Sequence, residues 1–270
     1  MNWKKLQNGS DIRGVALEGI EGEHVNLTPE VIETIAKSFV RWIRNNSDCE
    51  TPTIAVGMDC RLSGSSIKSA FVKGAVEAGA NVVDCGLAST PAMFMTTISE
   101  HVKATASVMV TASHLPFNRN GLKFFTPKGG LDSNDIASIL AIAENGEYVF
   151  EGEKGSSSTL DFMDIYSRHI ADYICEGVNA DDYQHPLKGM HIIVDAGNGN
   201  GGFFEKILSM LGADTKGSQF LDPDGRFPNH IPNPEDREAM ASVCKAVEES
   251  DADLGVIFDT DVDRSAIIGR

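Results

Sequence analysis

The segment with the clearest potential for chemistry is DTDVDR, residues 259 to 264, in which three aspartates alternate. In an extended loop, side chains at alternate positions point to the same side, so Asp259, Asp261 and Asp263 are expected to face one another. Three carboxylates this close repel unless a cation lies between them. A solvated acidic turn is the plainer alternative. The apolar run DLGVIF before the loop argues against it, because a buried strand there would hold the loop rigidly.

Two other carboxylate-rich sites are excluded by the residues that follow. An EF-hand starting at Asp259 needs glycine at its sixth position and glutamate at its twelfth, where the chain has Arg264 and Arg270. A haloacid-dehalogenase phosphatase would use Asp259 and Asp261 as nucleophile and acid, but it needs a lysine and further acids downstream. Only nine residues follow Asp261. The remaining interpretation is an all-oxygen magnesium site with room for a phosphate oxygen.

A serine and a histidine stand side by side in TASHLPFNRNGLKFF, residues 111 to 125, directly after the apolar run ATASVMV. Reactive groups of α/β proteins gather where such a buried strand ends. The G-x-S-x-G elbow of hydrolases is absent, because Ala112 precedes Ser113 and His114 follows it. By itself the pattern leaves three readings for Ser113: nucleophile, phosphate carrier or ordinary loop residue. Polar residues cluster nearby: Asn118, Asn120, Gly121 and Lys123.

A glycine loop, GNGNGG at residues 197 to 202, competes as a binding site. It satisfies G-x-G-x-x-G between an expected strand and an expected helix, and Asp222 follows at the distance of a ribose-binding acid. Asp195, however, would place its charge beside a bound pyrophosphate, and Asp222 lies in the turn DPDG. A nucleotide-binding domain therefore stays open as an alternative.

Three arginines lie close to these loops: Arg13 in SDIRG, Arg61 in DCRLSG, and Arg264 after the acids. An arginine held near a phosphate offers a fork of donors that lysine cannot match. Each of them alone is more often the partner of a surface salt bridge than a ligand contact.

The bulk composition narrows the class of protein. A net charge of −16 over 270 residues argues against general nucleic-acid binding and against anionic membrane surfaces. No run of 18 apolar residues appears, and the N-terminus lacks the core of a signal peptide. A cytoplasmic protein is expected, and a mature form from which a leader was removed is the alternative. The five cysteines show neither C-x-x-C pairs nor zinc-ligand spacing, which indicates reduced thiols.

Strands and helices alternate along the chain. Hydrophobic periodicity, helix caps and glycine stops predict these elements. Strands are expected at 53–57, 81–86, 104–110, 121–126, 190–196, 253–259 and 265–269. Helices are expected from Thr28 to about Ile43, at 65–78, briefly from Thr90, and at 132–145, 159–176, 203–211 and 235–250.

This alternation predicts an α/β protein of two consecutive domains, with mixed, mostly parallel sheets covered by helices on both faces. The polar stretch EGEKGSSSTL, residues 151 to 160, is the best linker candidate. Domain 1 is therefore expected at 1–152 with the serine loop at 111–123, and domain 2 at 153–270 with the metal-binding loop at 259–264.

Four motifs in fixed order relate the chain to a known family. DIRG, TASHLP followed by NGLK, FPNHIP and DTDVDR together resemble the α-D-phosphohexomutases, which include phosphoglucomutase, phosphomannomutase and phosphoglucosamine mutase. The resemblance covers essentially all 270 residues. It implies interconversion of hexose 1-phosphate and 6-phosphate through a phosphoserine and a bisphosphate intermediate, with hexose phosphate and hexose bisphosphate as partners.

The resemblance also implies roles for the site residues. Ser113 matches the serine that carries the phosphoryl group, and it completes the Mg²⁺ shell with Asp259, Asp261 and Asp263. Lys123 matches a lysine implicated in proton transfer, and His114 a histidine beside the phosphoserine. Arg13 and Arg264 match arginines that line the transfer site, and Asn120 is expected to order the loop.

Several features depart from the family pattern. Thr260 replaces a common glycine, Leu115 a common asparagine, and Ser10 a common tyrosine, which suggests a divergent subgroup. Family members carry four domains, and no segment of these 270 residues resembles the third or the fourth. We therefore expect the chain to represent the N-terminal catalytic half, with negligible turnover alone because the distal phosphate is not clamped. A non-catalytic regulatory fragment is a further alternative.

Overall fold

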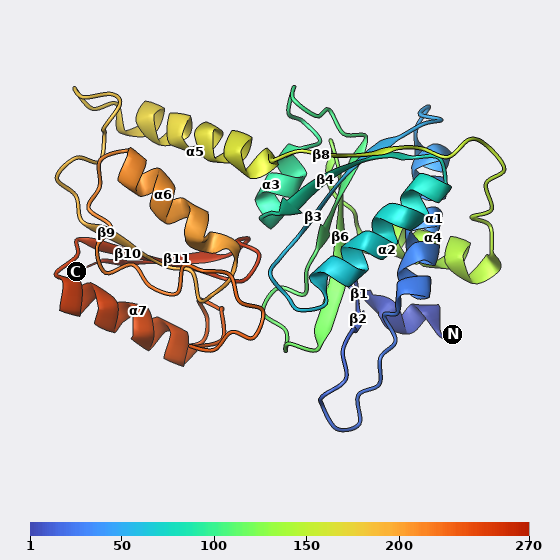
Figure 1. Ribbon diagram of the computed structural model, residues 1–270, viewed down its shortest axis with the longest axis horizontal. Helices are drawn as coiled ribbons and strands as arrows, with labels where there is room; N and C mark the ends of the chain where they lie inside the picture. The colour runs from blue at the N-terminus through green and yellow to red at the C-terminus, as the bar shows by residue number, and fades with distance from the viewer. Residues whose placement is uncertain (270) are drawn as a thin grey trace. The chain divides into compact units, whose positions relative to one another are not determined.

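Two units make up the chain in the computed structural model, which describes residues 1–269: unit 1 spans Met1–Asp161 and unit 2 spans Phe162–Arg270 (Figure 1). The boundary lies after Asp161 rather than after Gly152, because part of the expected linker, Ser157–Thr159, forms a strand on the sheet of unit 1. Among the described residues, no helix combines the length and the apolar character that crossing a membrane requires.

Unit 1 is built on one mixed sheet with the strand order β1-β2-β6-β5-β3-β4-β8, and β7 pairs with β6. The strands β5, β3, β4 and β8 are parallel, whereas β1, β2, β6 and β7 join through antiparallel pairings. The strands are β1 Gln7–Asn8, β2 Asp11–Val15, β3 Thr53–Met58, β4 Asn81–Leu87, β5 Ala106–Val110, β6 Arg119–Thr126, β7 Gly129–Gly130 and β8 Ser157–Thr159.

Helices cover both faces of this sheet (Figure 1). The helices α1 (Pro29–Asn46), α2 (Gly64–Glu77) and α4 (Ser133–Asn145) share one hydrophobic core with the strands, centred on Phe39, Phe71 and Phe124. The short helix α3 (Thr90–Met95) covers the other face and contacts β3, β5 and β6. A 3-10 turn, η1 (Trp3–Leu6), precedes β1.

The caps of two of these helices follow their sequence signals. Thr28 accepts the N–H of Val31 at the start of α1, and Asp132 forms a capping box with Asp135 at the start of α4. The four strands β1, β2, β7 and β8 were not predicted from the sequence. They are short, and β2 contains Arg13 and Gly14, so their hydrophobic patterns are weak.

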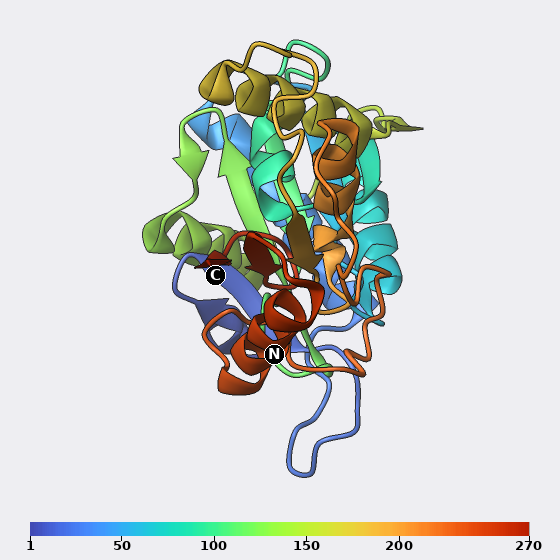
Figure 2. The same ribbon diagram turned by 90° about the vertical axis from the view of Figure 1, so that its left-hand side faces the viewer.

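Unit 2 contains a three-stranded sheet with the order β11-β10-β9. β9 (Ile192–Asp195) and β10 (Leu254–Phe258) are parallel, and β11 (Ser265–Gly269) returns antiparallel to β10. The helices α5 (Phe162–Val178) and α6 (Phe203–Met210) lie on one face, and α7 (Arg237–Ser250) lies on the other (Figures 1 and 2). A 3-10 turn, η2 (Asn200–Gly202), leads into α6.

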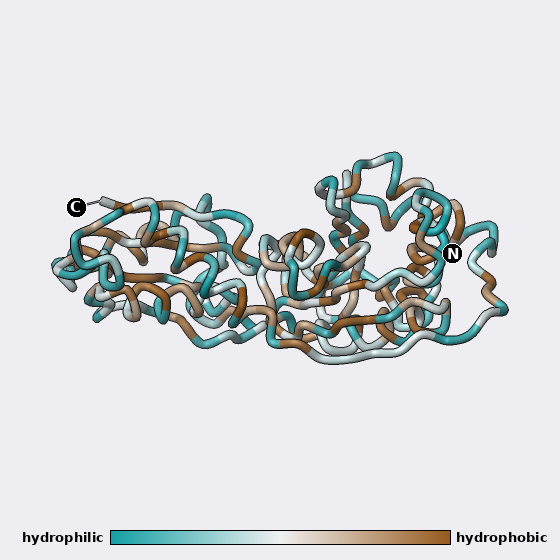
Figure 3. The backbone as a smooth tube through the Cα atoms, turned by 90° about the horizontal axis from the view of Figure 1, so that it is seen from above, coloured by the Kyte–Doolittle hydropathy of each residue, from teal (hydrophilic) through white to brown (hydrophobic). Residues whose placement is uncertain are grey.

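The hydrophobic pattern of β9 shows why this sheet is covered twice. Ile192 and Val194 join the core beneath α5 and α6, whereas Ile193 packs with Val247 of α7. Alternate side chains of a strand point to opposite faces, so a continuous apolar strand requires a helix on each side. In both units, hydrophobic stretches alternate with hydrophilic turns along the chain (Figure 3). The predicted α/β architecture with mixed sheets is confirmed.

Candidate functional site

The three alternating aspartates occupy the loop that follows β10. Asp259 and Asp261 are fully buried, and Asp263 is exposed. One carboxylate oxygen from each lies within 4.8 Å of the others. The structure thus brings the predicted metal ligands together, and this oxygen-only donor set suits a hard divalent cation.

Asp259 anchors the loop through its own carboxylate. Its Oδ1 accepts the backbone N–H groups of Asp263 at 3.0 Å and of Arg264 at 3.1 Å. Its Oδ2 accepts Nη2 of Arg264 at 3.0 Å, and Nη1 of Arg264 also reaches the side-chain oxygen of Asn233 at 3.1 Å. Val262 adopts φ +62°, a conformation that β-branched residues rarely take. Bonds to the carboxylate of Asp259 therefore hold the loop in a conformation that is strained at Val262.

Burial raises the pKa of the Asp259 carboxyl to about 8, and the charges of Asp261 and Asp263 add to the rise. A hydrogen bond from the backbone of Arg264 acts in the opposite direction. The Asp259 carboxyl ordinarily has a pKa of 3.8. Between this pH and about 8, the metal-free native state therefore keeps a proton on Asp259 that the unfolded chain has lost. Ionisation of Asp259 therefore costs stability as the pH rises through this window.

We expect the metal-free protein to lose stability as the pH rises from about 4 to about 8. A divalent cation binds the ionised carboxylates, so Mg²⁺ should raise the melting temperature more at pH 8 than at pH 5. Thermal unfolding at both pH values, with Mg²⁺ and with EDTA, measures the difference. Asp181→Asn, at an exposed acid of the same unit, should behave like the wild type. Equal Mg²⁺ effects at the two pH values would contradict the assignment.

The glycine loop packs against the aspartate loop. A Cβ on Gly199 would lie 2.9 Å from Cα of Thr260, and the N–H of Asn200 donates to the carbonyl of Thr260 at 2.9 Å. A Cβ on Gly201 would lie 2.8 Å from the ring of Phe258, and one on Gly202 would lie 2.2 Å from the carbonyl oxygen of Leu221. These glycines make room for the protein's own chain. This geometry disfavours the nucleotide alternative, in which the glycines make room for a pyrophosphate.

Gly199→Ala is expected to destabilise the protein by about 1 to 3 kcal/mol and to weaken metal binding, because the new methyl group displaces Thr260. Gly177→Ala provides the matched control. A Cβ there meets nothing within 4 Å, and alanine in a helix stabilises by about 0.5 to 1 kcal/mol. Chemical unfolding and Mg²⁺ titration measure the two effects. If both variants bind Mg²⁺ like the wild type, the glycine loop does not position the aspartates.

A buried Asp195–His230 pair contacts the start of the glycine loop. Nε2 of His230 lies 3.1 Å from both carboxylate oxygens of Asp195, and Nδ1 lies 3.0 Å from the carbonyl of Ile231. Burial lowers the pKa of His230, but the bonds to Asp195 and Ile231 outweigh it, so the net pKa is raised. Both ring nitrogens face acceptors, which favours the doubly protonated ring. Asp195 Oδ1 also accepts the N–H of Gly197 at 2.9 Å.

In unit 1, Ser113 lies in the loop after β5 and is 8% exposed, with φ +52°. Its N–H donates to Oγ1 of Thr111 at 2.8 Å, and that hydroxyl donates to Oδ2 of Asp59 at 2.7 Å. Nδ1 of His114, an exposed residue, lies 3.4 Å from the Ser113 hydroxyl oxygen. The serine is thus fixed by its backbone, and the adjacent histidine lies at the outer limit of hydrogen bonding to its hydroxyl.

Arg13 and Lys123 lie on the same face of the sheet beside this loop. In the antiparallel pairing of β2 and β6, Arg13 lies opposite Gly121, two residues before Lys123. Nη2 of Arg13 binds Oδ2 of Asp11 at 2.7 Å, and Nη1 donates to the carbonyl of Thr111 at 3.3 Å. A Cβ on Gly121 would lie 2.7 Å from Cδ of Arg13, so glycine here leaves space for the arginine.

Asn120 also contributes to the order of the serine loop. Its Nδ2 donates to Oγ of Ser63 at 2.9 Å, and its Oδ1 accepts the N–H of Gly121 at 2.8 Å. This buried side chain links the end of the loop to the residue before α2, which agrees with the ordering role expected for it.

The predicted residues thus fall into two groups. Ser113, His114, Lys123 and Arg13 belong to unit 1, and the aspartates and Arg264 belong to unit 2. Each group is assembled within its own unit, and the convergence of the two on one ion stays a prediction. No role was predicted for Asp59 and Thr111, Asp195 was considered only as an obstacle to a bound pyrophosphate, and His230 was noted only within the motif FPNHIP. The available signal was position, because Asp59, Thr111 and Asp195 all end or follow parallel strands.

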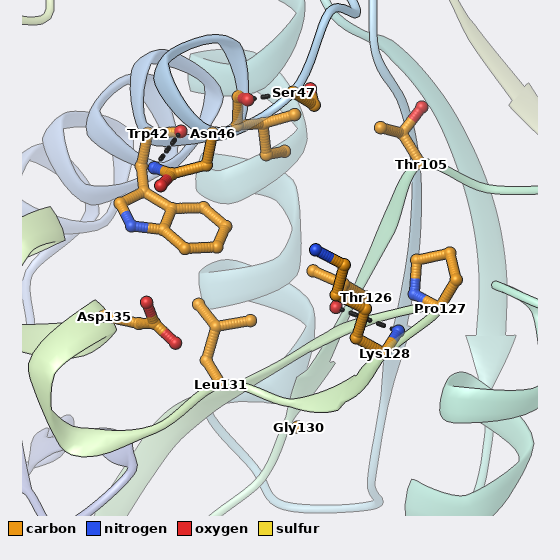
Figure 4. A pocket seen from close by; sticks show the side chains of 11 residues that line it. Trp42, Asn46, Ser47, Thr105, Thr126, Pro127, Lys128, Gly130, Leu131 and Asp135 are labelled. Atoms are coloured by element: carbon orange, nitrogen blue, oxygen red, sulfur yellow. Dashed lines mark hydrogen bonds between the residues drawn. The ribbon is translucent and has the colours of Figure 1, made fainter.

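A cavity of about 500 Å³ lies at the other end of the unit 1 sheet, between the end of α1 and the turn before α4 (Figure 4). Trp42, Leu131 and Asp135 line one part of it, and Thr126 and Lys128 another. It contains none of the predicted site residues. Polar groups on its wall bind their own backbone, as Asn46 does to the carbonyl of Trp42 at 2.8 Å.

Family models match almost the whole chain. Residues 4–149 match "Phosphoglucomutase/phosphomannomutase, alpha/beta/alpha domain I", and residues 164–270 match domain II of the same family. The division between the two matches falls at the boundary between units 1 and 2.

Individual relatives give the same picture. The chain is 31% identical over 261 residues to a phosphoglucomutase of Neisseria meningitidis serogroup B, and the match covers 96% of this chain and 52% of that protein. It is 34% identical over 257 residues to a phosphomannomutase of Salmonella typhimurium, and the match covers 92% of this chain and 52% of that protein. A solved phosphoglucomutase/phosphomannomutase family protein from Burkholderia thailandensis superposes with a TM-score of 0.77 at 27% identity, over 97% of this chain and 54% of that one.

The chain therefore spans about half the length of the relatives it matches. The matched family models, the relatives and the α/β architecture of both units agree. The chain belongs to the phosphoglucomutase/phosphomannomutase family and comprises its domains I and II.

Proposed function

We propose that the chain is the N-terminal catalytic half of a phosphohexomutase, which interconverts hexose 1-phosphate and hexose 6-phosphate. The observation that carries the proposal is the aspartate trio, whose carboxylate oxygens lie within 4.8 Å of one another in a family member that also carries the serine loop. A phosphorylated Ser113 carries nearly two negative charges, and Mg²⁺ on Asp259, Asp261 and Asp263 would offset them.

In the proposed reaction, the phosphoryl group moves from Oγ of Ser113 to a hydroxyl of the hexose monophosphate. The serine O–P bond breaks and the sugar O–P bond forms. Lys123 takes the proton of the sugar hydroxyl, and an equivalent proton returns to the serine oxygen, which becomes a free hydroxyl. The bisphosphate then reorients and returns its other phosphate to the serine. Arg13 and Arg264 supply positive charge, and His114 positions groups beside the phosphoserine.

The choice of metal follows from the donor set. Three carboxylates leave coordination positions for a phosphoryl oxygen and water, as Mg²⁺ prefers in phosphoryl transfer. We propose that the oxygen of phosphorylated Ser113 is one of these ligands. A phosphorylated protein should accordingly bind Mg²⁺ more tightly than the unphosphorylated protein.

Both phosphoglucomutases and phosphomannomutases are among the relatives at similar identity, so hexose phosphates as a class are the proposed substrates. Hexose bisphosphate is the proposed phosphoryl donor to the resting serine. Such phosphates are intracellular metabolites, and we therefore propose a cytoplasmic location.

The test is phosphorylation of the 270-residue chain by glucose 1,6-bisphosphate, followed by intact-mass analysis. We expect one phosphoryl group per chain, dependent on Mg²⁺ and prevented by EDTA, with negligible turnover of glucose 1-phosphate. A protein that is folded and binds Mg²⁺ yet never accepts a phosphoryl group would refute the catalytic role. That result would favour a regulatory fragment, whereas thermal stabilisation by NAD(P) or ATP without a Mg²⁺ effect would favour the nucleotide alternative.

A further inference from the structure

Arg61 lies beneath the serine loop, in the segment that follows β3. Its side chain has no exposed surface. Nη1 donates to the carbonyl oxygens of Pro116 at 2.8 Å and Arg119 at 3.2 Å. Nη2 donates to the carbonyl of Leu115 at 2.6 Å and to that of Ser113. One guanidinium therefore gathers four carbonyl groups of the serine loop.

These contacts make Arg61 unsuitable as a phosphate ligand, which was one interpretation of its place in the sequence. The two η nitrogens carry four hydrogens, and the four carbonyls account for them. Nε lies 3.4 Å from Oδ2 of Asp59, a fully buried carboxylate. The charge of Arg61 is thus balanced by Asp59 and directed at the backbone of the loop.

The same pair fixes Ser113 from both sides. Its carbonyl is bound by Arg61, and its N–H is bound by Thr111, whose hydroxyl donates to Asp59. Oδ1 of Asp59 accepts the N–H of Arg61 at 3.0 Å, which closes the network. Ser113 itself adopts φ +52°, a left-handed conformation that costs energy for a residue with a Cβ. A loop without these bonds would relax toward an extended backbone and turn the serine away.

We propose that Arg61 is the positioning residue of Ser113: with Asp59 it holds Ser113 in the left-handed conformation from which the serine hydroxyl reacts. The phosphoryl-transfer part of this statement rests on the function proposed above. The conformational part depends only on the contacts within unit 1.

Arg61→Lys is the primary variant, because lysine keeps the charge but cannot bind four carbonyls at fixed angles. The double variant Asp59→Asn/Arg61→Met removes both buried charges together, so neither is left unpaired in the core. Arg44→Lys is the matched control. That arginine belongs to α1 of the same unit, where it stacks on Phe150 and donates to the carbonyl of Glu50.

Two measurements are made on each variant. Hydrogen exchange reports the amides of Ser113, Leu115 and Arg119, all of which donate hydrogen bonds within the loop. Intact mass reports the rate of phosphorylation by glucose 1,6-bisphosphate with Mg²⁺. For Arg61→Lys and for the double variant, we expect loop exchange at least about tenfold faster and phosphorylation about 100-fold slower. Exchange in β3 and β5 should stay at the wild-type rate, and Arg44→Lys should match the wild type throughout.

The outcomes separate the two proposals. Wild-type loop exchange in both Arg61 variants overturns the positioning role, as does faster exchange spread evenly over unit 1, which indicates general destabilisation. Fast loop exchange with a wild-type phosphorylation rate also overturns it. If the wild type accepts no phosphoryl group, the proposed function fails, and the exchange comparison still decides whether Arg61 holds the loop.

Discussion

Replacing Ser113 with alanine is expected to abolish phosphorylation of the chain and to reduce phosphoryl transfer by more than about 10⁴-fold. The covalent carrier is lost, and no other hydroxyl can take its place without the same backbone. Ser113 is held at φ +52° by bonds to both its N–H and its carbonyl, so its oxygen occupies a position that the loop defines. Intact-mass analysis after incubation with glucose 1,6-bisphosphate and Mg²⁺ measures the effect.

The bonds that hold the loop involve the backbone of Ser113, so alanine should preserve the fold and the melting temperature. Ser138→Ala removes an exposed serine from α4 of the same unit and should be phosphorylated like the wild type. Phosphorylation of Ser113→Ala at the wild-type level would mean that another residue carries the phosphate, and the assignment of the serine loop would be wrong.

Asp261→Asn is expected to weaken Mg²⁺ binding by about 100-fold or more. Changes in residues that merely orient ligands cost about 10- to 100-fold in metal affinity, and the loss of a buried carboxylate ligand should cost at least as much. Asparagine has nearly the same shape, so packing at this fully buried position is retained. Removing one negative charge also relieves the repulsion among the three acids, so the metal-free variant should be more stable than the metal-free wild type. Calorimetric titration and thermal unfolding with EDTA measure the two effects.

The combination of weaker binding and higher metal-free stability is specific to a charge cluster built for a cation. Asp222→Asn serves as the control, because Asp222 is exposed and would bind a ribose only in the nucleotide alternative. It should leave Mg²⁺ affinity unchanged. Should Asp261→Asn bind Mg²⁺ with wild-type affinity, the trio would be an acidic turn and not a metal centre.

Much of the fold could be predicted because its strongest signals are local. The helix that begins after Thr28 and the helix capped by Asp132 have strong caps and apolar stripes, and both are found. The buried strands of unit 1 and unit 2 follow from apolar runs between polar loops. The segments Gln7–Asn8, Asp11–Val15 and Ser157–Thr159 were not predicted, because such short strands gain their stability from pairing with other strands and carry little hydrophobic pattern of their own.

The candidate site was predicted in part, and the difference has a physical cause. Residues that act with their own side chains, such as the three aspartates, leave a pattern in a short stretch of sequence. Residues that hold a loop, such as Asp59 and Arg61, act on segments 52 or more positions away and leave no such pattern. For this reason Arg61 was considered only as a phosphate contact or a salt-bridge partner, and its bonds to the serine loop were not predicted. From sequence alone, an arginine beside a loop can be interpreted as a phosphate contact, and only its hydrogen-bond partners in the structure show another role.

The sequence by itself determined the α/β class, the order of the main elements and the chemical groups available: a serine, a lysine and three alternating acids. Only the tertiary structure decided that the glycine loop packs against Thr260, that Asp195 pairs with His230, and that Arg61 binds the carbonyl groups of the serine loop. The physical reason is range. Strand and helix patterns come from the periodicity of neighbouring residues, whereas burial and hydrogen bonding between distant loops depend on how the completed sheets bring them together.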